Sequence, residues 1–204
     1  MHNLSFFNDI APITMYDPLA EVLGAAEEGI LTYTYSDMVK LAGHSCPTVA
    51  GTYLMLQKGI KRLYPDTLPV RGEIKVYFQG SLGEGVVGVM SNIATFITGA
   101  TDISGFHGLN GKYDRRGLVE YGAAISGEIA IERIDTKDRM ILSYHPKVVP
   151  ADPKMAEWLG LILSDKANFE IEKSFQMAWQ NRVKSILIEY AEHPGLIIMQ
   201  QEKK

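Results

Sequence analysis

The chain has 204 residues, a formal net charge of −4 and a single cysteine. An acidic chain lacks the basic face of a general nucleic-acid binder, and one cysteine excludes an internal disulfide framework. No segment approaches the roughly 20 consecutive apolar residues that cross a membrane. We therefore expect a cytoplasmic protein that binds neither nucleic acid nor membrane.

The first half of the chain alternates helical and strand patterns. Asp17 and Pro18 have the pattern of an N-cap and a first helical residue, and they predict a helix over 17–28. Gly43 is expected to end a second, short helix through MVKLA. The other segments expected here are a strand over 30–35, a helix over 46–63, a strand over 72–80 and a helix over 86–100.

The second half begins with the segment 101–118, which is too rich in glycine and polar residues for regular structure. A loop of this length inside a compact domain is usually functional or disordered. The LIIM cluster at 196–199 is expected to dock on the protein or on a second copy of it. The segments expected between them are a hairpin of strands over 126–134 and 139–145, and helices over 150–164 and 169–193.

This order of elements predicts an α+β fold. Because helices and strands alternate only partly, we expect a mixed or antiparallel sheet that helices cover mainly on one face, followed by C-terminal helices. The chain then divides into an α+β core domain over 1–149, which carries the cysteine, and a helical extension over 150–204.

The single cysteine lies in the stretch AGHSCPTVAG, two residues after His44 and directly before Pro47. This pattern places Cys46 at the N-terminus of a helix, where unpaired N–H groups and the helix dipole favour a thiolate. A thiolate is a nucleophile and a soft metal ligand, and His44 is close enough to act with it as a base or a second ligand. Each of these residues alone also fits a purely structural role.

Further ligands can come from the 101–118 loop. His107 stands between two glycines and is expected to complete a His/Cys/His metal set with His44 and Cys46. The cations of the loop, Lys112, Arg115 and Arg116, are expected to bind a small anionic ligand or cofactor. A solvated loop remains the competing interpretation for these side chains.

The sequence Gly43-His44-Ser45-Cys46-Pro47, opening a helix, resembles the signature of the formylmethanofuran dehydrogenase E-like family. The similarity covers about residues 30 to 145. It implies an α+β core of the topology grouped with the glyceraldehyde-3-phosphate-dehydrogenase catalytic domain, a homodimer, and a metal site, often zinc, at His44 and Cys46. A second cysteine that is frequent in the family is absent here, where the corresponding stretch is Thr98-Gly99-Ala100-Thr101.

The leading prediction is therefore a metal-binding homodimer with zinc, or another divalent transition metal, at His44, Cys46 and His107. Water or substrate would take the open coordination position, as in a catalytic site. One alternative is a metal-free enzyme in which Cys46 is the nucleophile and a histidine is the base. The other is a non-catalytic accessory or binding subunit.

Overall fold

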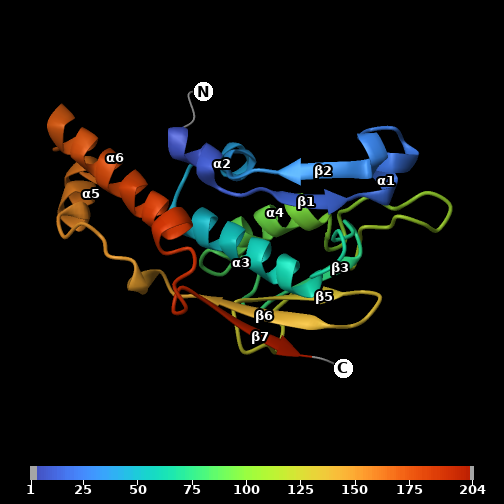
Figure 1. Ribbon diagram of the computed structural model, residues 1–204. Helices are drawn as coiled ribbons and strands as arrows, with labels where there is room; N and C mark the ends of the chain where they lie inside the picture. Colours follow the sequence, from blue (N-terminus) through green and yellow to red (C-terminus); the bar gives the residue numbers. More distant parts are fainter. Residues whose placement is uncertain (1–3, 203–204) are drawn as a thin grey trace.

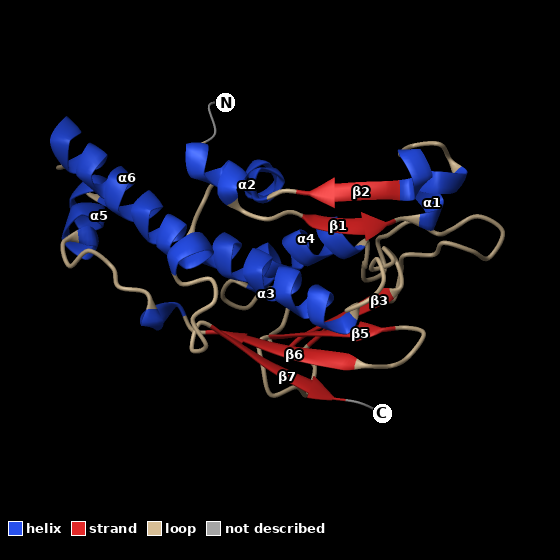
Figure 2. Cartoon of the chain, in the orientation of Figure 1, coloured by secondary structure: helices blue, strands red, loops and turns tan. Residues whose placement is uncertain are grey.

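The structure is a computed structural model that describes residues 4–202. Figure 2 shows three layers, in which helices α3 and α4 lie between a two-stranded sheet and a five-stranded sheet. Within the described residues the helices are α1 (Pro18–Val22), α2 (Tyr35–Ala42), α3 (Pro47–Leu63), α4 (Val87–Thr98), α5 (Met155–Leu163) and α6 (Phe169–Lys184). The strands are β1 (Ile13–Tyr16), β2 (Ile30–Tyr33), β3 (Ile74–Phe78), β4 (Val119–Tyr121), β5 (Ile129–Arg133), β6 (Arg139–Tyr144) and β7 (Ile197–Glu202).

The larger sheet has the strand order β4-β3-β5-β6-β7. It is mixed, because β3 pairs in parallel with β4 but antiparallel with β5, and β6 pairs antiparallel with both of its neighbours. Helices α3 and α4 cover one face of this sheet (Figure 1). The predicted α+β class with a mixed sheet is thereby confirmed, and so is the hairpin of β5 and β6.

Alternation along the strands puts the core on the helix side of the sheet. Ile74, Val76 and Phe78 of β3 are fully buried, and the residues between them are partly exposed. Two glycines let α3 approach this face closely. A Cβ at Gly51 would lie 2.3 Å from the Tyr144 ring, and one at Gly59 would lie 2.9 Å from Ile131. The helix therefore packs on the strands through its smallest residues.

Three of the predicted helices are shorter than the sequence pattern indicates, among them α5, which begins at Met155 and not at residue 150. α1 begins as predicted, with Asp17 as N-cap and Pro18 following, but it ends at Val22 and gives way to a turn at Gly24, where φ is 65°. The long C-terminal helix ends at Lys184, after which the chain makes a π-helical turn over Ser185–Glu189. Hydrophobic spacing continues through both breaks, so it cannot locate them.

Three strands do not appear in the sequence-based prediction. β1 pairs with β2 over four residues, and β4 is only three residues long. β7 contains most of the LIIM cluster and pairs with β6 from Arg139↔Glu202 to Tyr144↔Ile197. The docking expected of that cluster is therefore on the protein's own sheet. The domain boundary predicted at residue 150 stays a prediction, although β7 comes from the extension and joins the core sheet.

Helices α5 and α6 pack against each other and project from the body of the molecule (Figure 1). α5 has the sequence MAEWLGLIL, yet Met155 is its only buried residue. Leu163, Phe169 and Met177 of this hairpin are 75%, 71% and 66% exposed. Among the described residues, no helix is both long enough and apolar enough to cross a membrane.

Candidate functional site

The motif around the single cysteine lies where the sequence predicts it, at the start of α3. Cys46 is the N-cap and Pro47 is the first helical residue. The Cys46 Sγ accepts a hydrogen bond from the Val49 N–H at 3.5 Å, and the residue is half-buried. Gly43 ends α2 in the left-handed region, with a φ of 75°, which turns the chain toward α3.

The neighbouring imidazole contacts the backbone. His44 is exposed, and its Nδ1 lies 2.9 Å from the Ala42 carbonyl oxygen. Because a carbonyl only accepts, this contact places the proton on Nδ1 and leaves Nε2 as the acceptor. Within residues 4–202, no hydrogen bond joins His44 to Cys46. The thiol-nucleophile and accessory-protein alternatives both stay predictions.

Ser45, between the histidine and the cysteine, is the best-anchored residue of the motif. Its hydroxyl lies 3.0 Å from the Tyr35 hydroxyl, and its carbonyl accepts hydrogen bonds from the Trp179 Nε1 at 2.9 Å and the Gln180 Nε2 at 3.1 Å. The motif thus ties α6 to the start of α3. This is a structural role that a motif of five residues cannot reveal.

Several polar atoms near this end of α3 are buried without a hydrogen-bond partner among the described residues. They are the Tyr144 hydroxyl, the Gln180 Oε1 and the Arg182 Nε. Burial raises the pKa of the Tyr144 hydroxyl, so this group stays protonated at neutral pH. None of the three side chains is fully buried as a whole.

The structure contradicts the predicted zinc site. Within residues 4–202, no group of three or more histidine, cysteine, aspartate or glutamate side chains could hold a metal ion. His107 lies in the 101–118 loop, which packs near α1, whereas Cys46 begins α3 beside α6 (Figure 1). α3 has 17 residues, and at 1.5 Å per residue it separates its two ends by about 25 Å. The predicted metal-binding function at His44, Cys46 and His107 is therefore wrong.

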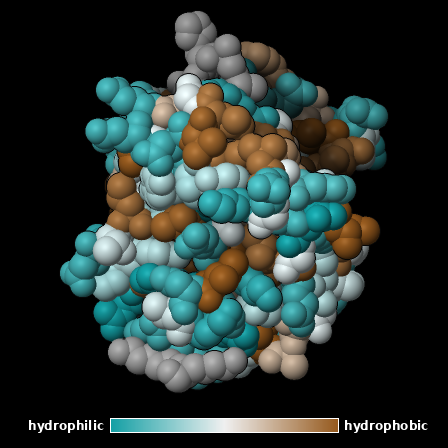
Figure 3. All heavy atoms as spheres, turned by 90° about the vertical axis from the view of Figure 1, so that its right-hand side faces the viewer, coloured by the Kyte–Doolittle hydropathy of each residue, from teal (hydrophilic) through white to brown (hydrophobic). Residues whose placement is uncertain are grey.

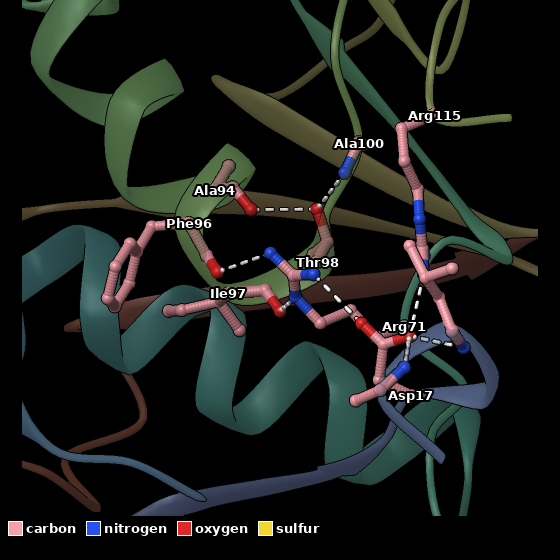
Figure 4. Close-up of polar contacts among 10 residues, drawn as sticks. Asp17, Arg71, Ala94, Phe96, Ile97, Thr98, Ala100 and Arg115 are labelled. Atoms are coloured by element: carbon pink, nitrogen blue, oxygen red, sulfur yellow. Dashed lines mark hydrogen bonds and ion pairs between the residues drawn. The ribbon is translucent and has the colours of Figure 1, made fainter. Parts of the chain in front are cut away.

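A different cluster forms where β1, β3 and the 101–118 loop meet, toward the C-terminal end of α3. Asp17 is buried and binds two guanidinium groups, with the Arg71 Nη1 at 2.9 Å and the Arg115 Nη2 at 2.7 Å (Figure 4). We refer to these three residues as the charge triad. It brings together side chains that lie 54 and 98 positions apart in the sequence.

The two arginines of the charge triad differ in their remaining contacts. Arg71 also donates to the carbonyls of Phe96 and Ile97, both at 3.1 Å, and so caps the C-terminus of α4 (Figure 4). Such a position favours a cation through the helix dipole. Arg115 is 95% buried, and among the described residues its Nε has no partner. Arg71 is thus held structurally, whereas Arg115 retains an unused donor.

Two glycines make the space for these guanidinium groups. Gly72 has a φ of 88°, and a Cβ there would lie 1.4 Å from the Arg115 Nη1. Gly99 has a φ of 72°, and its Cβ would lie 3.1 Å from the Arg71 Cζ. Both positions need glycine for the backbone as well as for the space.

The charge triad alters the titration of its members. Burial alone would raise the pKa of Asp17, but the hydrogen bond from Arg71 and the charge of Arg115 outweigh it, so this pKa is below the ordinary carboxyl value. Burial lowers the pKa of Arg115, and the nearby charge of Arg71 acts in the same direction against the opposing effect of Asp17. Two guanidinium groups share one carboxylate, which leaves positive charge in excess.

A pocket of about 330 Å³ opens beside the charge triad. Its walls are Pro18, Arg71, Gly72, Glu73, Lys112, Tyr113, Asp114 and Arg115. Two of the predicted ligand-binding cations, Lys112 and Arg115, therefore line one pocket. The third, Arg116, instead forms an exposed ion pair with Asp114 at 2.7 Å. His107 lies near the same carboxylate, and its charge helps to lower the Asp114 pKa, after the larger effect of Arg116.

The sequence does not identify Asp17 as a member of a site, and it makes Arg71 and Glu73, which flank the start of a strand, only weak candidates to pair with each other or to face one. The Asp17-Pro18 pattern predicts a helix N-cap, and Asp17 does accept the Leu19 N–H at 2.9 Å. A carboxylate that already caps a helix gives no local sign that it also pairs with distant cations. A weak signal was available in Arg71-Gly72, since a glycine after a charged residue at a strand start permits close approach of another side chain.

Comparison with known proteins gives no relative from which to transfer a function. No family model matches the chain, and no curated protein matches it either.

Proposed function

We propose that the protein binds a small anionic ligand in the pocket beside the charge triad, with Arg115 and Lys112 as its principal contacts. The observation that carries this proposal is the position of Arg115, whose guanidinium lines the pocket and shares the Asp17 carboxylate with Arg71. Two guanidinium groups that share one carboxylate leave a positive charge, which an anion in the pocket would balance. Carboxylate and phosphate both fit the planar donor array of a guanidinium.

The surroundings of the pocket support an anion over a neutral ligand. Arg71 and Arg115 share the single carboxylate of Asp17, and Lys112 adds a third cation at the rim. The volume of about 330 Å³ is at the small end of the usual range for ligand pockets. A small organic anion or a phosphate group matches both the size and the charge.

Titration calorimetry with acetate and with inorganic phosphate tests this proposal. We expect saturable millimolar or tighter binding that Lys112→Ala weakens roughly fivefold, because one charge-assisted contact is lost. Arg116→Ala is the matched control, since Arg116 belongs to the same loop but does not line the pocket. Binding that is absent, or that both variants weaken equally, would contradict the proposal.

We also propose that a second copy of the chain covers the α5–α6 hairpin. Leu163, Phe169 and Met177 expose apolar side chains there, and apolar surface concentrated on one element is typical of an interface. The hairpin projects from the body, so two copies could pack their hairpins around a two-fold axis (Figure 1). Charges of both signs in α6, among them Glu172 and Lys173, suit such a self-complementary contact.

Light scattering coupled to gel filtration tests the homodimer. We expect the mass of a dimer for the wild-type protein and of a monomer for Met177→Glu, because a buried charge at a two-fold interface has no partner. Leu82→Glu is the control, since Leu82 is 50% exposed on a loop outside the hairpin. A monomeric wild-type protein would overturn this part of the proposal.

Two further points of this proposal rest on the sequence alone. Membership of the formylmethanofuran dehydrogenase E-like family rests on Gly43-His44-Ser45-Cys46-Pro47, which opens α3 in an α+β fold. A cytoplasmic location rests on the single thiol.

A further inference from the structure

Exposed apolar side chains lie on the segments that form the cationic pocket. Val22, Phe106 and Leu109 are 59%, 43% and 44% exposed, and we call these three residues the apolar rim. Figure 3, which faces this end of the molecule, shows brown apolar patches among teal hydrophilic side chains. Isolated exposed apolar residues are common on proteins, so a role in ligand binding has to be argued from their position relative to the pocket.

Each member of the apolar rim is tied to a residue that lines the pocket. The Phe106 carbonyl accepts the Arg115 N–H at 2.9 Å, and Leu109 exchanges two backbone hydrogen bonds with Lys112, at 2.8 and 2.9 Å. Val22 follows Pro18 by four residues in α1, so both project from the same side of that helix. The three residues of the apolar rim are therefore backbone neighbours of the pocket wall.

The charges in the pocket wall limit the charge of its ligand. Arg116 balances the Asp114 carboxylate, and the carboxylates of Asp17 and Glu73 balance two of the cations Arg71, Lys112 and Arg115, which leaves one positive charge in excess. A ligand with several negative charges would meet these carboxylates without enough cations to balance it. A single anionic group fits this balance best.

We propose that the ligand is an amphiphilic monoanion, a carboxylate with a short acyl or aryl group, whose charged end binds Arg115 and Lys112 and whose apolar end lies on the apolar rim. This inference rests on the proposed function, because it names the class of anion that the same pocket takes. The guanidinium supplies the charge-assisted hydrogen bonds, and the rim supplies apolar area that a small inorganic anion would leave unused.

The same features fit a membrane surface less well. The chain has a net charge of −4, and Glu21, Glu27 and Glu28 are all exposed in the α1 region next to the pocket. Anionic lipid headgroups attract surfaces that are basic over a wide area, which this end of the molecule is not. A concave pocket of small volume also suits one molecule better than a bilayer.

Calorimetry with acetate, butanoate, hexanoate and octanoate tests the inference on the full chain. We expect the affinity to rise about two- to fourfold for each added methylene that reaches the rim. Leu109→Ser should weaken octanoate binding severalfold while leaving acetate binding unchanged. Leu82→Ser is the matched control, because Leu82 has similar exposure on a loop away from the pocket.

The outcomes separate this inference from the function on which it rests. If acetate binds and Lys112→Ala weakens its binding, but octanoate binds no more tightly than acetate, the inference of an amphiphilic ligand is wrong. The proposed binding of a small anion in the pocket is then retained. If no member of the series binds, both are wrong. If vesicles of phosphatidylglycerol retain the protein and Leu109→Ser releases it, while free octanoate does not bind, the partner is a membrane and the small-ligand inference fails.

Discussion

The two ends of α3 present opposite kinds of site. At its N-terminus, residues adjacent in sequence form a recognisable motif, but within residues 4–202 the hydrogen bonds of Cys46 and His44 are to local backbone groups. At its C-terminal end, the charge triad joins Asp17, Arg71 and Arg115 from three distant segments beside an open pocket. The residues that are adjacent in sequence thus contact their own backbone, whereas the fold assembles the charge triad from residues that are far apart in sequence.

The largest effect on stability is expected at the charge triad. Asp17→Ala leaves two guanidinium groups together in a buried site and also removes the α1 N-cap. We expect the free energy of unfolding to fall by about 3–5 kcal/mol, as when one partner of a buried ion pair is removed. Urea denaturation measures this loss. Asp114→Asn should change the stability little, because the Asp114 carboxylate forms an exposed ion pair. An equal loss of stability in both variants would contradict the expected difference between the buried and the exposed ion pair.

The same carboxylate makes stability depend on pH. Because the Asp17 pKa is lowered in the folded protein, its stabilising contribution is complete above the ordinary carboxyl pKa of about 4. That contribution is lost as the pH falls through the lowered value. Unfolding followed between neutral pH and acid should therefore show a shallower decline for Asp17→Asn than for the wild type. Parallel curves would mean that Asp17 is not stabilised by its arginines.

A glycine substitution tests how tightly the triad is packed. Gly72→Ala places a Cβ on the Arg115 guanidinium and also strains a residue with positive φ. We expect a loss of about 2–4 kcal/mol from strain and overpacking together. Gly117→Ala is the control, since Gly117, in the 101–118 loop, has a φ of 66° but no atom within 4 Å of the added Cβ. It should cost only the strain, about 1–2 kcal/mol.

At the N-terminal end of α3, a substitution at Tyr144 measures what an unpartnered buried hydroxyl costs in stability. It has no partner among the described residues, so Tyr144→Phe should stabilise the protein by about 1 kcal/mol. Tyr53→Phe is the matched comparison, because the Tyr53 hydroxyl donates toward the Ala11 and Tyr33 carbonyls at 2.9 and 3.1 Å. That variant should lose about 1–2 kcal/mol. A destabilising Tyr144→Phe would reveal a bound water or ligand at this hydroxyl.

The smallest effect is expected at the cysteine itself. Cys46→Ser keeps an N-cap acceptor for the Val49 N–H and should change the stability by less than about 0.5 kcal/mol. Cys46→Ala removes the cap and should cost about 1 kcal/mol. Thermal unfolding of the three proteins side by side gives both values. If serine costs as much as alanine, the thiol stabilises the helix by packing and not by capping.

Local signals in the sequence predicted most helices and the central hairpin. Asp17-Pro18 and Cys46-Pro47 each begin a helix as expected, because N-cap and proline preferences act within a few residues. The zinc site failed for the opposite reason. Its third ligand, His107, was chosen by residue type, and no local pattern records that α3 separates the loop from Cys46.

Some of the residues that line the pocket could be predicted from the sequence. Lys112 and Arg115 drew attention as loop cations, and both line it. Arg71 and Asp17 could not be added, because their partnership depends on how the end of β1 meets the segment before β3 through the isolated bridge Tyr16↔Val70. The three missed strands have a similar cause, since a strand of three to six residues is defined by its neighbour more than by its own sequence.

The pairing of β7 with β6 also determines the order in which the molecule can be completed. During synthesis on a ribosome, β3, β5 and β6 emerge well before Ile197, so the nascent sheet first has β6 as an uncovered edge. An apolar, unpaired edge is prone to capture by other chains. The projecting helices α5 and α6 must therefore be made and turned back before the last strand protects the sheet.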